Sequence, residues 1–137
     1  MSKILFVEDD PLIIKIYTTR LSADGHTVFA AENGEEGIKM AEQVQPDLII
    51  LDIMMPRMDG FEVLKRIREN TTLKNKPVIM YSNLNNEEEI TRAKKMGVNE
   101  FLIKANLSPT QMVAKIKEYL SGPNNVPPPV TSAVSSA

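Results

Sequence analysis

The chain of 137 residues contains no cysteine and only one histidine. The absence of cysteine excludes disulfide bonds and thiolate metal sites, and it is compatible with a reducing cytosol. No apolar run approaches the roughly 20 residues that a membrane-spanning helix needs. A signal peptide is not expected either, because Glu8, Asp9 and Asp10 interrupt the one apolar stretch near the N-terminus. These absences predict a cytoplasmic protein that does not contact a membrane.

The chain also lacks a large excess of positive or negative charge, with 16 Lys and Arg residues against 18 Asp and Glu residues. The formal net charge of −2 argues against general nucleic-acid binding. The hydrophobic content of 42% and the charged content of 25% are typical of a soluble globular protein. The length is that of one domain with one substantial core.

Five short apolar stretches alternate with amphipathic segments. The stretches at residues 3–7, 26–31, 48–51, 78–81 and 99–103 have the length and composition of strands. Each is followed by a segment with apolar residues at helical spacing. The alternation predicts an α/β fold, a five-stranded parallel sheet with helices on both faces.

The stretch from Asp47 to Gly60 is the most informative part of the chain. Residues 48–51 form an unbroken apolar run, as expected of a strand buried on both faces, and the run ends at Asp52. Pro56 then excludes a regular element. Asp52 alone would more often be a turn residue, but open α/β sheets place their chemistry at the carboxyl ends of central strands.

Polar side chains follow four of the predicted strands: Glu8 and Asp9, then Asp52, Ser82 and Lys104. Each alone has an ordinary explanation as a helix-start acid, a loop hydroxyl or a solvated charge. Because parallel strands end at one edge, we expect them to meet there. Crowded carboxylates raise at least one pKa unless a cation shares the site, and oxygen donors without histidine or cysteine suit Mg²⁺. A hydroxyl and an ammonium could hold phosphoryl oxygens, with Asp52 as the nucleophile.

Four segments together resemble the receiver domain of bacterial two-component response regulators. They are residues 3–11, the loop 52–60, residues 77–82 and the stretch 97–104. The resemblance covers residues 3 to about 121, and it implies a (βα)5 flavodoxin-like receiver fold with residues 1–121 as the receiver domain. It also implies a phosphorylation-switched signalling module of a phosphorelay. Such a module is not an enzyme, apart from catalysing its own phosphotransfer and dephosphorylation.

The resemblance assigns the phosphoacceptor and the metal ligands. Asp52 would accept a phosphoryl group from a histidine kinase or a histidine phosphotransfer protein. Asp9 and Asp52 would bind Mg²⁺ directly, Glu8 would act through water, and the backbone carbonyl of Met54 would supply a further ligand.

The resemblance also assigns the residues that bind the phosphoryl group and the residue that responds to it. Ser82 and Lys104 would bind its oxygens. Phe101 would occupy the aromatic switch position, coupled to Ser82 and to the surface of the fourth helix, fifth strand and fifth helix. An unidentified downstream protein would bind that surface, and the resemblance also allows a phosphorylation-dependent homodimer. Direct nucleic-acid binding is not expected.

Two departures from the family pattern lie beside the phosphoryl-binding residues. Ala105 follows Lys104, where the family usually has proline after a cis bond. A cis bond to a non-proline residue costs about 3 kcal/mol, so we expect a trans bond and a shifted loop. Asn83 stands where alanine or glycine is common, and it could narrow the entry to Asp52 or add a hydrogen bond to the site.

Other departures concern hydrolysis and switching. Met54 and Leu84 occupy the positions that, in the family, influence the water attacking the acyl phosphate. Both are apolar here and cannot orient water, which predicts slow self-dephosphorylation. Phe101 replaces the more frequent tyrosine, so a switch at this position would act by packing alone.

The first helix and the C-terminal residues give two further predictions, a docking surface and a tail. Leu12 and Ile14 are apolar residues beyond the core face of the first helix, and they suggest a docking face for the phosphodonor. Residues 122–137 have the composition of a flexible Pro/Ser/Ala-rich tail or linker stub. The chain would then be a stand-alone receiver or a piece that ends within a linker.

Two alternatives remain open. A receiver-like scaffold independent of phosphorylation would explain Ala105 and Asn83, although the presence of the acceptor and its partner residues argues against it. A Mg²⁺-dependent phosphatase with an aspartyl nucleophile would need a second aspartate two residues after Asp52, where Met54 stands. It would also need a cap domain for its substrate, which we do not expect from these residues.

Overall fold

Five strands and five α-helices alternate along the chain in the computed structural model, which describes residues 2–84 and 86–121. A short 3₁₀ helix, η1, lies between β5 and α5. The elements are β1 Lys3–Val7, α1 Pro11–Ala23, β2 Thr27–Ala31, α2 Gly34–Val44, β3 Leu48–Leu51, α3 Gly60–Glu69, β4 Val78–Ser82, α4 Glu87–Lys95, β5 Glu100–Ile103, η1 Lys104–Asn106 and α5 Pro109–Ser121.

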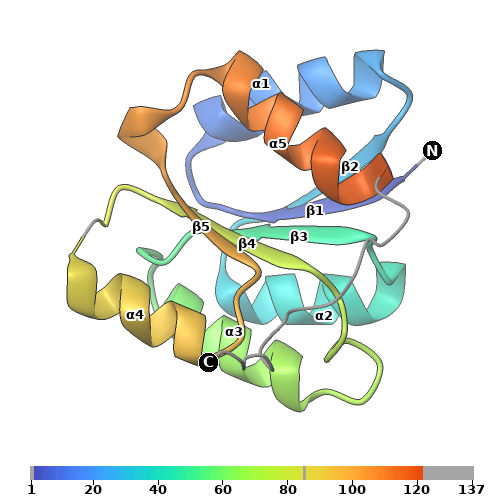
Figure 1. Cartoon of the computed structure of the whole chain (residues 1–137). Coiled ribbons are helices and arrows are strands. Elements are labelled where there is room, and N and C mark those ends of the chain that lie inside the picture. The colour runs from blue at the N-terminus through green and yellow to red at the C-terminus, as the bar shows by residue number, and fades with distance from the viewer. Residues whose placement is uncertain (1, 85, 122–137) are drawn as a thin grey trace.

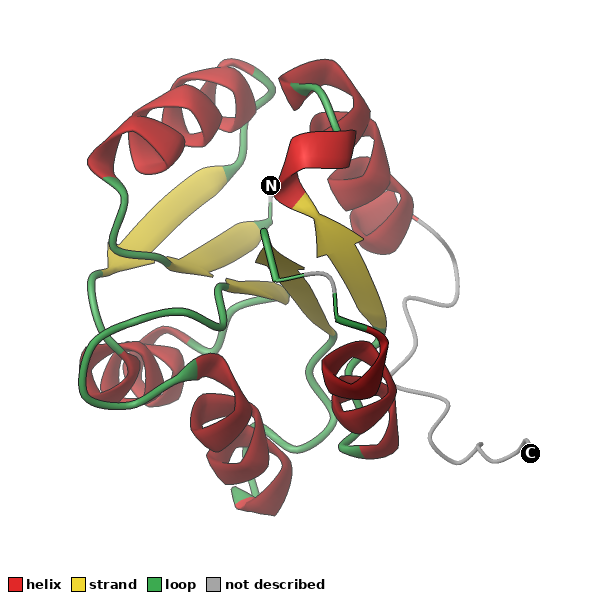
Figure 2. Cartoon of the chain, turned by 90° about the vertical axis from the view of Figure 1, so that its left-hand side faces the viewer, coloured by secondary structure: helices red, strands yellow, loops and turns green. Residues whose placement is uncertain are grey.

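The sheet is parallel throughout, with the strand order β2-β1-β3-β4-β5. Helices α1 and α5 cover one face, and α2, α3 and α4 cover the other (Figures 1 and 2). The predicted fold class is thus confirmed. The chain runs from β1 outward to β2 and then crosses back to β3, so the edge at β1 and β3 is the position where ligands bind in such sheets. None of the described helices combines the length and hydropathy needed to span a bilayer.

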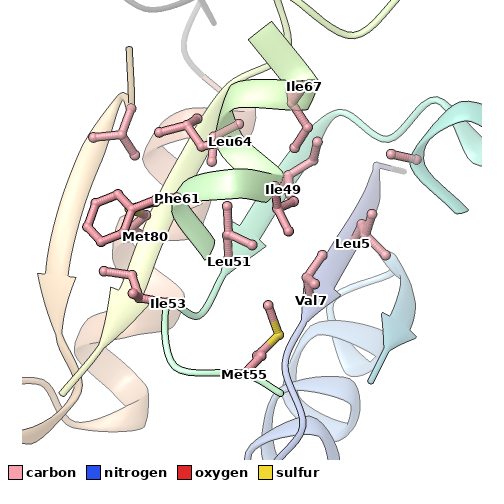
Figure 3. Close-up of a cluster of buried hydrophobic side chains, with 14 of the residues drawn as sticks. Leu5, Val7, Ile49, Leu51, Ile53, Met55, Phe61, Leu64, Ile67 and Met80 are labelled. Carbon is pink, nitrogen blue, oxygen red and sulfur yellow. The ribbon is translucent and has the colours of Figure 1, made fainter. Parts of the chain in front are cut away.

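The core consists of two clusters, one on each face of the sheet. In β1, Leu5 and Val7 point toward α2 and α3, whereas Ile4 and Phe6 point toward α1 and α5. Figure 3 shows the first of these clusters, where side chains of β1, β3 and β4 meet those of α3. Both faces of each central strand are covered, which explains why the strands have unbroken apolar sequences.

The structure differs from the sequence-based expectation mainly at the amino edge of the sheet. Strands β2 and β5 begin at Thr27 and Glu100, one residue later than predicted. At Asn99, the side-chain Oδ1 accepts a hydrogen bond from the Val78 amide at 2.8 Å, so a side chain replaces a backbone carbonyl in the ladder. The polar loop 71–76 also buries Leu73 completely.

Arg68 of α3 binds the loops at this amino edge together. Its guanidinium donates to the carbonyl oxygen of Gly97 at 2.7 and 2.9 Å. Further bonds reach the carbonyls of Lys74 and Lys76 and the side chain of Asn99. Burial lowers the pKa of Arg68 to about 10, which leaves the guanidinium charged at neutral pH. One side chain therefore satisfies four acceptors from two segments, residues 74–76 and 97–99.

We expect Arg68→Ala to lower the free energy of unfolding by about 2–4 kcal/mol, because several partly buried acceptors lose their donor at once. Urea denaturation measures this. Arg66→Ala on the same helix is the control: Arg66 pairs with Glu62 on the surface, and its loss should change stability by less than about 0.5 kcal/mol. Equal effects of the two substitutions would contradict the role given to Arg68.

Candidate functional site

Asp52 is fixed by the strands on one side and by a glycine on the other. Its amide donates to the carbonyl oxygen of Val7 at 3.0 Å, which continues the pairing of β3 with β1. A Cβ on Gly60 would lie 2.5 Å from the carbonyl oxygen of Asp52. Only glycine at the start of α3 therefore allows the helix to pack so closely on this backbone. The sequence contained the Asp59-Gly60 pair, but its spacing did not reveal this contact.

Glu8 and Asp9 follow β1 and meet Asp52 at the carboxyl edge of the sheet. One carboxylate oxygen from each of the three residues lies within 4.8 Å of the others. Glu8 and Asp52 are buried and Asp9 is exposed. Three carboxylates with one open side are a donor set that fits a hard divalent cation such as Mg²⁺. The predicted convergence of these residues is thus present in the structure.

Lys104 reaches the same cluster from the end of β5. Its Nζ lies 2.8 Å from Oε1 of Glu8 and 3.2 Å from Oδ2 of Asp52. It also lies 5.6 Å from the centre of the Tyr81 ring. Only 14% of the Lys104 side chain is exposed. The shorter contact, to Glu8, was not predicted, because sequence spacing does not indicate which carboxylate a long side chain selects.

The pKa values follow from burial and from this ion pair. Burial raises the pKa of Glu8 to about 7; the hydrogen bond from Lys104 opposes the rise, and the charge of Asp52 adds to it. Burial alone would lower the pKa of Lys104, but the hydrogen bond to Glu8 and the two negative charges outweigh it and raise this pKa. A cation therefore already balances part of the acidic cluster.

The other predicted site residues surround this cluster. The Met54 amide donates to Oδ1 of Asp52 at 3.3 Å, while Met54 as a whole residue is 62% exposed. Ser82 is fully buried at the end of β4, and its hydroxyl accepts a hydrogen bond from the Leu84 amide at 3.3 Å. Phe101 is partly buried against the cluster beneath α2–α4. Among the described residues, no hydrogen bond joins Ser82 to the carboxylates.

The peptide bond after Lys104 agrees with the sequence-based expectation. No peptide bond in the described part of the chain is cis, so the bond to Ala105 is trans as predicted. The chain forms the 3₁₀ turn η1 here, and the Ala105 amide donates to Oδ1 of Asn83 at 3.0 Å. The sequence suggested that Asn83 narrows the entry to Asp52 or adds a hydrogen bond to the site, whereas the hydrogen bond observed joins it to the neighbouring loop.

The predicted docking face is only partly exposed. Leu12 in the first turn of α1 is 63% exposed. Ile14, in contrast, is half-buried against the cluster beneath α1 and α5, so the prediction that it lies beyond the core face of the helix was wrong. Ile13, Ile14 and Ile16 of α1 all pack against this cluster. The buried side of the helix is therefore wider than the helical spacing indicated. Ile14 instead contributes to a groove of about 500 Å³ that reaches Glu8 and Asp9.

The fold and the acidic cluster define a class: an α/β protein whose carboxyl edge combines a cation-binding set of acids with a lysine. Residues 4–117 match the response regulator receiver domain family. The chain belongs to this family of two-component signalling proteins.

Similar proteins include regulators of transcription and chemotaxis. A probable transcriptional regulator of Guillardia theta, ycf27, is 36% identical over 122 residues, which are 89% of this chain and 46% of that protein. The chemotaxis protein CheY4 of Vibrio cholerae has a TM-score of 0.80 at 29% identity, covering 86% of this chain and 98% of that one. The Mn(2+)-bound response regulator Rcp1 gives 0.80 at 26%, covering 93% and 99%. This chain spans about half the length of the first curated relatives it matches.

The Lys104 ion pairs lead to a prediction for stability. In metal-free buffer, Lys104→Met should lower the free energy of unfolding by about 3 kcal/mol, because it leaves two buried carboxylates without their cation. Saturating Mg²⁺ should restore part of this loss. Denaturant titrations with EDTA and with Mg²⁺ measure both effects.

Lys115→Met is the matched control, since Lys115 pairs with Glu100 where both side chains are about 30% exposed. It should cost less than about 1 kcal/mol, with no response to Mg²⁺ beyond that of the wild type. A Lys104→Met variant that loses no more stability than this control would show that the ammonium does not hold the cluster together.

Proposed function

We propose that Asp52 accepts a phosphoryl group from a histidine kinase or a histidine phosphotransfer protein, and that the chain acts as a phosphorylation-switched module of a phosphorelay. One observation carries the proposal: the buried Asp52 carboxylate lies among two further acids and the Lys104 ammonium. In the reaction, an Asp52 oxygen attacks phosphorus, the bond from phosphorus to the donor's histidine nitrogen breaks, and the imidazole keeps that electron pair.

A divalent cation, Mg²⁺, is part of the proposal. Asp9 and Asp52 would hold it directly, Glu8 would act through water, and the carbonyl of Met54 would be a further ligand. The clustering of three acids supports this assignment, and the related Rcp1 is described as Mn(2+)-bound. When bound, the ion would neutralise part of the negative charge on the phosphoryl oxygens.

Lys104 and Ser82 would receive the oxygens of the transferred group. The Lys104 ammonium already lies 3.2 Å from Asp52, so a small movement would bring it to an oxygen attached there. The Ser82 hydroxyl accepts a hydrogen bond from Leu84 and can still donate its own hydrogen. The chain would catalyse its own phosphotransfer and dephosphorylation and act on no other substrate.

The partners would bind on two surfaces. Leu12 and Met54 are the exposed large hydrophobic residues among those described. Leu12 follows Asp9 by three residues in the sequence, and the Met54 amide donates to Asp52. We assign the phosphodonor to this region and the groove beside it. The surface of α4, β5 and α5 would carry the signal to a downstream protein or to a second copy of the chain. Phe101, packed beneath α4, would act with Ser82 as the switch.

The proposal also assigns the boundaries of the receiver domain. Residues 1–121 would be the receiver domain, and residues 122–137, which lie outside the described residues, a tail or linker stub. Relatives named as transcriptional regulators are about twice as long. We assign no nucleic-acid contact to the receiver residues, and we propose a cytoplasmic location.

The decisive experiment incubates the protein with Mg²⁺ and acetyl phosphate and measures its intact mass. We expect wild-type protein to gain one phosphoryl group and Asp52→Asn to gain none. Asp47→Asn, which changes an exposed aspartate at the opposite edge of the sheet, should label like the wild type. An unlabelled wild type would favour the phosphorylation-independent scaffold, the alternative suggested by Ala105 and Asn83.

The same assay tests the stability of the acyl phosphate. We expect slow hydrolysis in the wild type, because the side chains of Met54 and Leu84 near Asp52 and Ser82 offer no group that orients water. Leu84→Glu should speed hydrolysis by about tenfold by supplying a carboxylate that can position water, and Met54→Ala should speed it by removing an apolar shield. Leu12→Ala is the control and should leave the rate unchanged. If neither substitution speeds the loss, these positions do not limit hydrolysis.

A further inference from the structure

Strands β4 and β5 end at the same level, and each delivers one proposed phosphoryl-binding residue. Their last paired residues are Ser82 and Ile103. Ser82 closes β4, and Lys104, the next residue after Ile103, begins the turn η1. Beyond this pair the two segments leave the sheet as loops. The relative position of Ser82 and Lys104 therefore depends on what connects these loops.

A side chain makes such a connection just beyond the ladder. Oδ1 of Asn83 accepts a hydrogen bond from the Ala105 amide at 3.0 Å, across 22 positions of sequence. The Ala105 amide lies at the start of η1, where a 3₁₀ turn leaves its first N–H groups without internal acceptors. The turn itself is closed further on, where the Leu107 amide donates to the Lys104 carbonyl. Asn83 thus caps the turn from the loop after β4 and adds one link between the segments that follow β4 and β5.

This bond requires both residues. A proline at position 105 would have no N–H to donate, and an alanine or glycine at position 83 would have no side-chain acceptor. The two positions at which the chain departs from the family pattern around its phosphoryl-binding residues are therefore in direct contact. Ala105 provides the N–H donor of this hydrogen bond, and Asn83 provides its acceptor.

We propose that Asn83 is a positioning residue that acts through Ala105. Its hydrogen bond holds η1 against the loop after Ser82, and so keeps the Lys104 ammonium directed at Asp52 and Glu8. The inference builds on the proposed function of Asp52, although the placement of Lys104 can be measured without phosphorylation. The bond is exposed, so it adds little to stability. Its effect falls on the position of the lysine, and reaction rates are sensitive to such positions.

The test compares Asn83→Leu in two backgrounds, wild type and Ala105→Pro. In the wild-type background, Asn83→Leu should slow phosphorylation by acetyl phosphate by about three- to tenfold, the factor expected for one hydrogen bond. In the Ala105→Pro background the donor is already absent, so the same substitution should change the rate by less than about twofold. An equal slowing in both backgrounds would overturn the proposal and assign Asn83 a direct effect on entry to Asp52.

A second readout does not depend on phosphorylation. Acetic anhydride acetylates free lysine amines, and peptide mass spectrometry compares Lys104 with Lys115 in the same sample. Asn83→Leu should raise the relative reactivity of Lys104 by about three- to tenfold, whereas Asn83→Asp, which keeps an acceptor for Ala105, should not. Unchanged reactivity in Asn83→Leu would overturn the proposal.

The control removes a comparable bond at the opposite edge of the sheet. Asp47 accepts a hydrogen bond from the Lys3 amide at 2.8 Å, also exposed and distant in sequence. Asp47→Ala should leave both the phosphorylation rate and the reactivity of Lys104 unchanged. If wild-type protein is not phosphorylated at all, the proposed function fails, and the acetylation result still decides the role of Asn83.

Discussion

The contact on which the site depends is the ion pair of Lys104 with Glu8 and Asp52. Two carboxylates that are almost fully buried would repel each other and would lose their hydration. A single ammonium, 2.8 and 3.2 Å from them, offsets both costs. That ammonium comes from β5, whereas the acids come from β1 and β3. The charge balance of the site therefore requires three strands to be in register.

The parallel sheet provides this register because it is buried on both faces. Alternate residues of β1, β3 and β4 pack against different helix layers, which leaves the strands little freedom to slide. At the carboxyl edge, the absence of a side chain at Gly60 lets α3 approach the Asp52 backbone. Hydrophobic packing thus determines where the acids lie, and their negative charge attracts the Lys104 ammonium to the same place.

Much of this arrangement could be predicted from the sequence, because its signals are local. Apolar stretches alternating with amphipathic segments predicted the fold, and polar residues after four strands predicted the acidic edge. The Lys104 preference for Glu8, the bond between Asn83 and Ala105 and the half-burial of Ile14 could not be predicted. Each depends on distances between segments that are far apart in sequence, and side-chain reach or helix rotation decides them.

The central claim is that this edge receives a phosphoryl group beside a divalent cation. A crystal structure with Mg²⁺ and beryllofluoride, a stable mimic of the phosphoryl group, tests it most directly. The account predicts beryllium on the Asp52 carboxylate, the metal on Asp9 and Asp52, and Lys104 moved from Glu8 to a fluorine. Beryllofluoride absent from Asp52, with Lys104 still bound to both acids at saturating ligand, would contradict the account.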